Sequence, residues 1–251
     1  MFDANSWAAN PGQPTLALGE IHVWRANLDC EPASLRALET TLAPAEQARA
    51  DRFRFPQDRN AFIATRGILR ELLGKYVSRA PAELVFDYAG RGKPSLHAAP
   101  DQAIQFNVSR SHDLALLAFT SRRSVGIDVE LVRPDFAATE IAQRYFSPQE
   151  IEELKSLPPQ SLAEGFFLCW TRKEAYVKAR GEGMQIPLNS FGVSLTPGQP
   201  ARLESTDSAR WSLHSITPDP RYVGALVAEG KDPRIVYLDW NSIDADPKIQ
   251  S

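Results

Sequence analysis

The chain has 251 residues, of which 43% are hydrophobic and 24% charged, as expected for an ordinary globular protein with one large domain or two small ones. Its formal net charge of −3 gives no indication of a nucleic acid or an anionic membrane as a partner. No apolar run approaches the length of a membrane span, and the first ten residues show neither the basic nor the apolar stretch of a signal peptide.

The two cysteines, Cys30 and Cys169, are far apart in the sequence, and Cys169 lies in an apolar run before Trp170. A thiol in such a run is typically buried and free. We therefore expect no disulfide and a cytoplasmic location. The four histidines are too scattered to form a zinc site.

Apolar periodicity and turn residues predict strands and helices in the first half of the chain. A strand over 21–26 precedes two helices between 44 and 76, which Pro56 separates because proline interrupts a helix. A short strand over 84–88 and a glycine-containing loop follow. Longer strands are predicted at 104–108, 114–120 and 125–130.

In the second half, a helix is predicted over 137–145. Ser147, Pro148 and Glu150 then carry the signature of a helix start, with a capping serine, a proline at the first position and a glutamate at the third. A long helix over 162–180 ends at Gly181. Further strands are predicted at 191–195, 211–216, 223–227 and 235–238, and the polar tail from Asn241 is predicted to be loose.

A weak internal repeat links the two halves. Three residues of the first half recur with the same spacing in the second: Pro44, Glu46 and Phe62 match Pro148, Glu150 and Phe166. The order of predicted elements also repeats. We therefore expect an α+β fold of two pseudo-symmetric halves, 1–122 and 123–251, each a small antiparallel sheet packed with helices, with the active site in the cleft between them.

An acidic pair interrupts an otherwise apolar strand at Gly126–Glu130. Strand alternation places Asp128 and Glu130 on one face, roughly 7 Å apart, and Ile127 on the other. Alone, the pair could be two solvated charges. However, acidic residues are poor strand formers, and Gly126 allows close approach of another backbone or a ligand. These features favour a metal site.

The long helix places Trp170, Glu174 and Lys178 on one stripe, at i, i+4 and i+8. The spacing of Glu174 and Lys178 alone is typical of a solvated surface pair. Trp170 on the same stripe argues against a fully exposed face. Carboxylates on a strand that face a carboxylate and an ammonium on a helix suit a hard cation bound to phosphate.

Basic residues precede this region. Arg49 and Arg66 lie on the first-half helices, where arginines usually carry solvated charge. Better candidates are the loop at Lys93 and Pro94 and the turn around Arg110, because each offers backbone N–H groups together with a cation, as phosphate sites do.

The two segments Gly126–Glu130 and Trp170–Lys178 together resemble the Sfp-type 4′-phosphopantetheinyl transferases. Shorter matches occur in the family's order at 92–94, 106–109 and 146–148, and the resemblance covers residues 44–195. It implies two related α+β halves and an enzyme of the holo-acyl-carrier-protein synthase type. This enzyme moves the 4′-phosphopantetheine arm of coenzyme A to a serine of an acyl or peptidyl carrier protein, with Mg²⁺, and releases adenosine 3′,5′-bisphosphate.

The resemblance also implies roles for individual residues. Asp128, Glu130 and Glu174 match the metal ligands, Glu174 is the candidate base and Lys178 lies near the pyrophosphate. The expected coenzyme A contacts are Arg49, Arg66, Lys93, Pro94, Ser109, Arg110 and Lys178. Since both halves of the cleft belong to one chain, we expect a monomer that needs neither nucleic acid nor membrane.

The chain departs from the family at one position. Arg110 stands between Ser109 and Ser111, where the family usually has histidine. An arginine can contact phosphate at every pH but cannot serve as a titrating base. We therefore expect Arg110 to be a phosphate contact only.

Two other functions are compatible with the same residues. The carboxylates could serve a metal-dependent phosphohydrolase or nucleotidyl transferase, in which water or a nucleotide hydroxyl attacks phosphate. Alternatively, the chain could bind coenzyme A or a carrier protein without catalysis. The presence of the three acids together with Lys178 argues against the second alternative.

Overall fold

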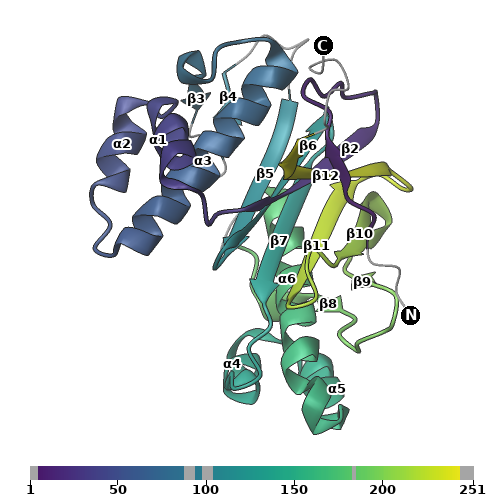
Figure 1. The fold of residues 1–251 in the computed structure, drawn as a ribbon. Helices are drawn as coiled ribbons and strands as arrows, with labels where there is room; N and C mark the ends of the chain where they lie inside the picture. The colour runs from purple at the N-terminus through teal and green to yellow at the C-terminus, as the bar shows by residue number, and fades with distance from the viewer. Residues whose placement is uncertain (1–4, 88–93, 98–103, 183–184, 244–251) are drawn as a thin grey trace.

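The computed structural model of the protein describes residues 5–87, 94–97, 104–182 and 185–243 (Figure 1). Most strands belong to two sheets. The larger sheet has the order β1-β12-β2-β6-β5. Its members are β1 (Ala8–Asn10), β2 (Glu20–Asn27), β5 (Ile104–Ser111), β6 (Leu114–Ser121) and β12 (Arg234–Ile243).

Strand β12 makes the larger sheet mixed. Strands β2, β6 and β5 pair antiparallel, whereas β12 runs parallel to both β2 and β1. The prediction of a purely antiparallel sheet for the first half is therefore wrong, because the last strand of the chain returns to this sheet. The predicted loose tail from Asn241 is also wrong as far as Ile243, since β12 continues to that residue. The Asn241 side chain accepts a hydrogen bond from the backbone of Asn27 on β2.

The smaller sheet has the order β10-β11-β7 and is antiparallel throughout. It contains β7 (Val125–Leu131), β10 (Trp211–Ile216) and β11 (Tyr222–Glu229). Two short hairpins complete the strands: β3 (Phe86–Asp87) with β4 (Ser95–Leu96), and β8 (Gly192–Val193) with β9 (Leu203–Glu204). The strands predicted at 84–88 and 191–195 are therefore real but shorter.

The helices follow one strand of each sheet, β2 in the larger and β7 in the smaller. After β2 come α1 (Pro32–Thr40), α2 (Pro44–Ala50) and α3 (Pro56–Val77), and after β7 come α4 (Ala138–Tyr145), α5 (Pro148–Ser156) and α6 (Leu162–Arg180). Single 3₁₀ turns occur at Pro81–Glu83, Pro159–Ser161, Leu188–Ser190 and Ser208–Arg210. Among the described residues, none of the helices has the length and apolar character needed to cross a membrane.

The predicted caps of the second half are confirmed. Ser147 and Glu150 form a capping box at the start of α5, in which Ser147 Oγ accepts from the Glu150 amide and Glu150 Oε2 accepts from the Ser147 amide. Helix α6 ends where Gly181 adopts a left-handed conformation, with φ of 71°. By contrast, α1 was not predicted, because Leu38 is its one buried residue and gives little helical periodicity.

The three largest hydrophobic clusters of the described residues each join two elements or sheets. One cluster joins α3 to the larger sheet, through residues such as Trp24, Leu72 and Phe119, and another joins α6 to the smaller sheet. A third cluster lies between the two sheets, where Ile21 and Leu116 meet Ile127 and Leu226. The sheets therefore pack face to face, with α1–α3 outside one of them and α6 outside the other (Figure 1).

Three strands of the larger sheet pair in the same sequence order as the three strands of the smaller one. In the larger sheet, β2 pairs with β6, which pairs with β5; in the smaller, β7 pairs with β11, which pairs with β10. Strands β2 and β7 are each followed in the chain by helices and a short hairpin, and only then by the other two strands of this pattern. Strand β5 is at the edge of the larger sheet and β7 at the edge of the smaller one, and these two edges lie side by side where the sheets adjoin.

Candidate active site

Side chains join the edge strands β5 and β7, which belong to different sheets. Asn107 Oδ1 accepts a hydrogen bond of 2.8 Å from the Ile127 amide, and Ser109 Oγ donates one of 2.7 Å to Asp128 Oδ1. Asn107 and Ser109 are alternate residues of β5, so their side chains lie on the same face of the strand, and both reach β7. The seam between the sheets therefore consists of polar side chains where a backbone ladder is absent from the described strands.

Ser111 continues this pattern at the end of β5. Its Oγ donates to Glu130 Oε2 at 2.7 Å and accepts from the Leu131 amide at 3.2 Å. The Ser109–Asp128 and Ser111–Glu130 pairs have the same sequence separation, so the two strands run side by side in the same direction. The predicted placement of Asp128 and Glu130 on one face of a strand is confirmed.

Helix α6 presents a narrow accessible stripe to this seam. From Gly165 to Ala179, every residue is buried except Trp170, Glu174 and Lys178, which are partly exposed. These are the residues that the i, i+4, i+8 pattern places on one stripe. Trp170 packs against Phe166, with ring centroids 6.0 Å apart, and so closes the stripe on its N-terminal side.

Lys178 connects the helix to both strands. Its Nζ lies 2.6 Å from Asp128 Oδ1, 3.1 Å from Ser109 Oγ and 3.2 Å from the Ile127 carbonyl oxygen. All three N–H donors of the ammonium thus have an acceptor at the seam. Because Asp128 is only 4% exposed, this ion pair lies largely out of water.

The carboxylates near Lys178 repel one another. Burial raises the pKa of the Glu174 carboxyl above its ordinary value; the charge of Asp128, and to a smaller extent that of Glu130, raises it further, while Lys178 lowers it. Burial likewise raises the pKa of Glu130, which the hydrogen bond from Ser111 partly offsets. Burial and mutual repulsion thus both favour the protonated forms of these carboxyls, while the nearby cations of Lys178 and Arg133 oppose that shift.

The donor set at the seam fits a hard divalent cation. Oxygen atoms from Asp128, Glu130 and Glu174 are the type that Mg²⁺ prefers, and Asp128 Oδ2 is buried without a hydrogen-bond partner in the described structure. Within the described residues, no group of three histidine, cysteine, aspartate or glutamate side chains is already arranged to hold a metal ion. Mg²⁺ usually keeps several waters and takes one or two carboxylates, so its binding requires no preformed cage.

Gly126 permits the close packing of β7 on α6. A methyl group at this position would overlap the carbonyl oxygen of Ala175 and the amide nitrogen of Ala179, both backbone atoms of the helix. The prediction that Gly126 lets another backbone approach is therefore confirmed. This contact sets the spacing between the strand that carries Asp128 and the helix that carries Glu174.

Gly126→Ala is expected to lower the free energy of unfolding by about 1–3 kcal/mol, because the backbone of α6 must move to make room. Urea unfolding of the purified variant measures this change. Gly192→Ala is the matched control, since the added methyl group there meets only the flexible side chain of Glu204, 3.3 Å away. Equal stability of the two variants would contradict the packing role of Gly126.

The other predicted coenzyme A contacts do not join this cluster within the described residues. Arg49 stacks on Phe62, and Arg66 forms an ion pair with Glu46 and lies over the ring of Phe86. Arg110 is exposed and shares its side of β5 with Phe106 and Val108, which pack toward α3, so it points away from the serines that flank it. Pro94 begins a described segment, and Lys93 falls outside the described residues.

Sequence reasoning missed the roles of Asn107 and Ser111. Their signal was present as polar residues at alternate positions of β5, beside an acidic pair at alternate positions of β7. Nothing in the sequence indicated that these two edges adjoin. The acids alone predicted a metal site, and the structure shows in addition that side chains of β5 hydrogen-bond to the strand that carries two of them.

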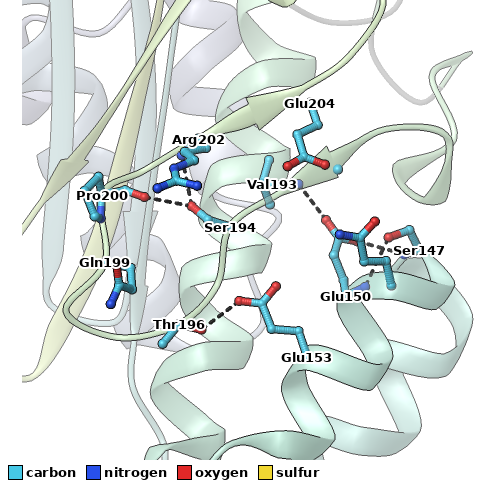
Figure 2. Close-up of a pocket in the computed structure, with 12 residues that line it drawn as sticks. Ser147, Glu150, Glu153, Val193, Ser194, Thr196, Gln199, Pro200, Arg202 and Glu204 are labelled. Carbon is cyan, nitrogen blue, oxygen red and sulfur yellow. Dashed lines mark hydrogen bonds between the residues drawn. The ribbon is translucent and has the colours of Figure 1, made fainter.

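A separate pocket lies between the start of α5 and the β8–β9 hairpin (Figure 2). Its wall includes Glu150, whose Oε1 accepts from the Val193 amide at 2.8 Å and pairs with Lys173 Nζ at 2.8 Å. Lys173 is fully buried and also donates to the carbonyl oxygens of Leu188 and Phe191. Although Lys173 precedes Glu174, its contacts are therefore structural, and none of the predicted site residues lines this pocket.

Comparisons with known proteins agree over most of the chain. Residues 28–122 match the family "4′-phosphopantetheinyl transferase, N-terminal", and residues 124–227 match the "4′-phosphopantetheinyl transferase superfamily". The 4′-phosphopantetheinyl transferase HetI of Nostoc sp. is 41% identical over 90% of this chain and 94% of its own length. A putative 4′-phosphopantetheinyl transferase of Synechocystis sp. is 34% identical over 70% and 72%, and Sfp of Bacillus subtilis is 28% identical over 76% and 84%.

Proposed function

The chain belongs to the Sfp-type 4′-phosphopantetheinyl transferases, and from this premise we propose that it transfers the 4′-phosphopantetheine arm of coenzyme A to a serine hydroxyl of an acyl or peptidyl carrier protein. The by-product is adenosine 3′,5′-bisphosphate. The observation that carries the proposal is the ion pair of Lys178 with Asp128 at the seam between the sheets, with Glu130 and Glu174 close enough to interact electrostatically with both.

Asp128, Glu130 and Glu174 are the residues that would hold Mg²⁺. The buried Asp128 Oδ2, which has no hydrogen-bond partner in the described structure, and the mutual repulsion of the three carboxylates support this assignment. When bound, the ion would neutralise charge that develops on the pyrophosphate as its bond to phosphorus breaks.

The protein's own groups supply the proton transfer and further charge stabilisation. The carboxylate of Glu174, on the accessible stripe of α6, takes the proton of the acceptor serine directly or through a water. The positive charge of the Lys178 ammonium, one helical turn further along the same stripe, stabilises the departing bisphosphate. Glu174 and Lys178 both belong to the largely buried helix α6, so the distance between them is set before substrates bind.

Coenzyme A is proposed to reach the site from the first half of the chain. The exposed guanidinium of Arg110, the loop of Lys93 and Pro94, and the first-half arginines Arg49 and Arg66 are the candidate phosphate contacts. Ser109 completes this set at the seam. We further propose that the halves 1–122 and 123–251 are related, which their shared strand order supports, and that the enzyme acts as a cytoplasmic monomer.

A carrier-loading assay tests the function. The full chain is incubated with coenzyme A, Mg²⁺ and an apo carrier protein, and the carrier is then weighed by mass spectrometry. The expected result is a mass gain equal to one phosphopantetheine arm, abolished by EDTA. Release of the bisphosphate without carrier modification would instead indicate a phosphohydrolase, and tight coenzyme A binding without turnover on acyl and peptidyl carriers would indicate a non-catalytic binding protein.

A further inference from the structure

Two serines of β5 make matching contacts with the acidic residues of β7. Each hydroxyl accepts a hydrogen bond from an N–H and donates to a carboxylate, and Ser111 Oγ also lies 3.4 Å from Nδ1 of His112. Ser109 Oγ lies 3.1 Å from the ammonium of Lys178 and donates to Asp128, and Ser111 Oγ accepts from the Leu131 amide and donates to Glu130. A hydroxyl has a single proton, so a bond accepted from an N–H leaves that proton for the carboxylate.

These contacts divide the two oxygens of each carboxylate. Ser109 holds Asp128 Oδ1, whereas Asp128 Oδ2 is buried and has no partner in the described structure. Ser111 holds Glu130 Oε2, which leaves Oε1 as the oxygen available for another contact. One oxygen of each acid is thus anchored to the neighbouring sheet, and the other is left to bind a ligand.

We propose that Ser109 and Ser111 are positioning residues, which hold Asp128 and Glu130 so that each offers one oxygen to the divalent cation. The inference rests on the proposed function, because it assumes that these acids bind the ion. It assigns to β5 a role in metal binding from the sheet opposite the acids, in addition to any contact with coenzyme A. Hydrogen bonds to metal-ligating carboxylates typically change metal affinity by about 10- to 100-fold.

The two carboxylates differ in how many hydrogen bonds hold them besides the one from a serine. Asp128 Oδ1 is also held by Lys178 Nζ at 2.6 Å, so it stays oriented without Ser109. For Glu130, the bond from Ser111 is the one hydrogen bond assigned to its side chain in the described structure. We therefore expect Ser111→Ala to weaken metal binding more than Ser109→Ala does.

The test is titration of the full-length protein with Mn²⁺ in the presence of coenzyme A, with free Mn²⁺ measured by EPR. Ser111→Ala should raise the Kd about 10- to 100-fold, Ser109→Ala should raise it less, and Ser111→Thr, which keeps the hydroxyl, should bind nearly as wild type. Ser121→Ala is the matched control, because the hydroxyl of this strand serine is buried without a partner in the described structure. Asn107→Ala removes a seam hydrogen bond that touches no carboxylate, so it should lower Tm without a comparable change in Kd.

If Ser111→Ala fails to fold, the Mn²⁺ affinities of Ser111→Cys and Ser111→Thr test the proposal instead. A thiol is similar in size to a hydroxyl but is a weak donor, so Ser111→Cys should weaken binding and Ser111→Thr should not. The proposal is overturned if Ser111→Ala or Ser111→Cys binds Mn²⁺ within twofold of wild type, or if Asn107→Ala weakens binding equally. Wild-type protein that loads a carrier while Ser111→Ala keeps full metal affinity would sink only the positioning role. Wild-type protein that binds no Mn²⁺ would remove the proposed metal site and this inference together.

Discussion

Glu174→Gln is expected to lower the turnover number for carrier loading by about 100- to 10,000-fold, the range typical for loss of a general base. The amide keeps the shape of the side chain but can neither accept the serine proton nor carry the negative charge that attracts a cation. Since α6 is otherwise buried from Gly165 to Ala179, apart from Trp170 and Lys178, the substitution leaves the helix packing unchanged.

The coenzyme A affinity of Glu174→Gln separates a chemical defect from a binding defect. Isothermal titration without a carrier should give a Kd within a few-fold of wild type, because none of the candidate coenzyme A contacts is altered. Glu164→Gln is the matched control, as Glu164 lies in the first turn of the same helix and is exposed. Its turnover should equal that of wild type.

Two results would contradict this role for Glu174. Unchanged turnover in Glu174→Gln would remove the carboxylate from the reaction. A loss of turnover matched by an equal loss of coenzyme A affinity would instead place Glu174 in substrate binding. Circular dichroism and Tm of the variant establish that the fold is retained in either case.

The local elements of the site could be predicted from the sequence because their signals are local. The caps at Ser147 and Gly181 define helix ends, and the single-residue alternation around Asp128 defines the faces of β7. The i, i+4, i+8 pattern on α6 is set by helical geometry alone. These features depend on neighbours within a few residues, which the sequence displays directly.

The remaining features depend on contacts between distant segments. Strand β12 pairs parallel with β2 across more than 200 positions of sequence, and no residue of either strand indicates that partner. The adjoining edges of β5 and β7 likewise follow from the packing of the two sheets through residues such as Leu116 and Ile127. Only after that packing is known do Asn107 and Ser111 become part of the site.

The turn around Arg110 illustrates the same limit. The sequence groups Ser109, Arg110 and Ser111 as one phosphate cradle, but strand β5 continues through all three residues. Strand geometry sends the serines toward β7 and the arginine to the opposite side. The hydroxyls therefore meet the carboxylates, while the side chain of Arg110 stays exposed.

Lys178→Met is expected to lower the turnover number about 100- to 1,000-fold, as the loss of one group that stabilises developing charge typically does. It also leaves Asp128, which is 4% exposed, without the ammonium that pairs with it at 2.6 Å. We therefore expect the free energy of unfolding of the metal-free protein to fall by about 2 kcal/mol, in the range of a hydrogen bond to a charged group.

The double variant Asp128→Asn with Lys178→Met distinguishes these two effects. Removing both charges should restore most of the lost stability, because no buried carboxylate is then left unpaired, but it should not restore turnover. Lys155→Met is the control, since Lys155 forms an exposed pair with Glu152 on α5. If Lys178→Met loaded carrier at the wild-type rate, or if the double variant recovered activity along with stability, Lys178 would act only as a structural counter-charge to Asp128.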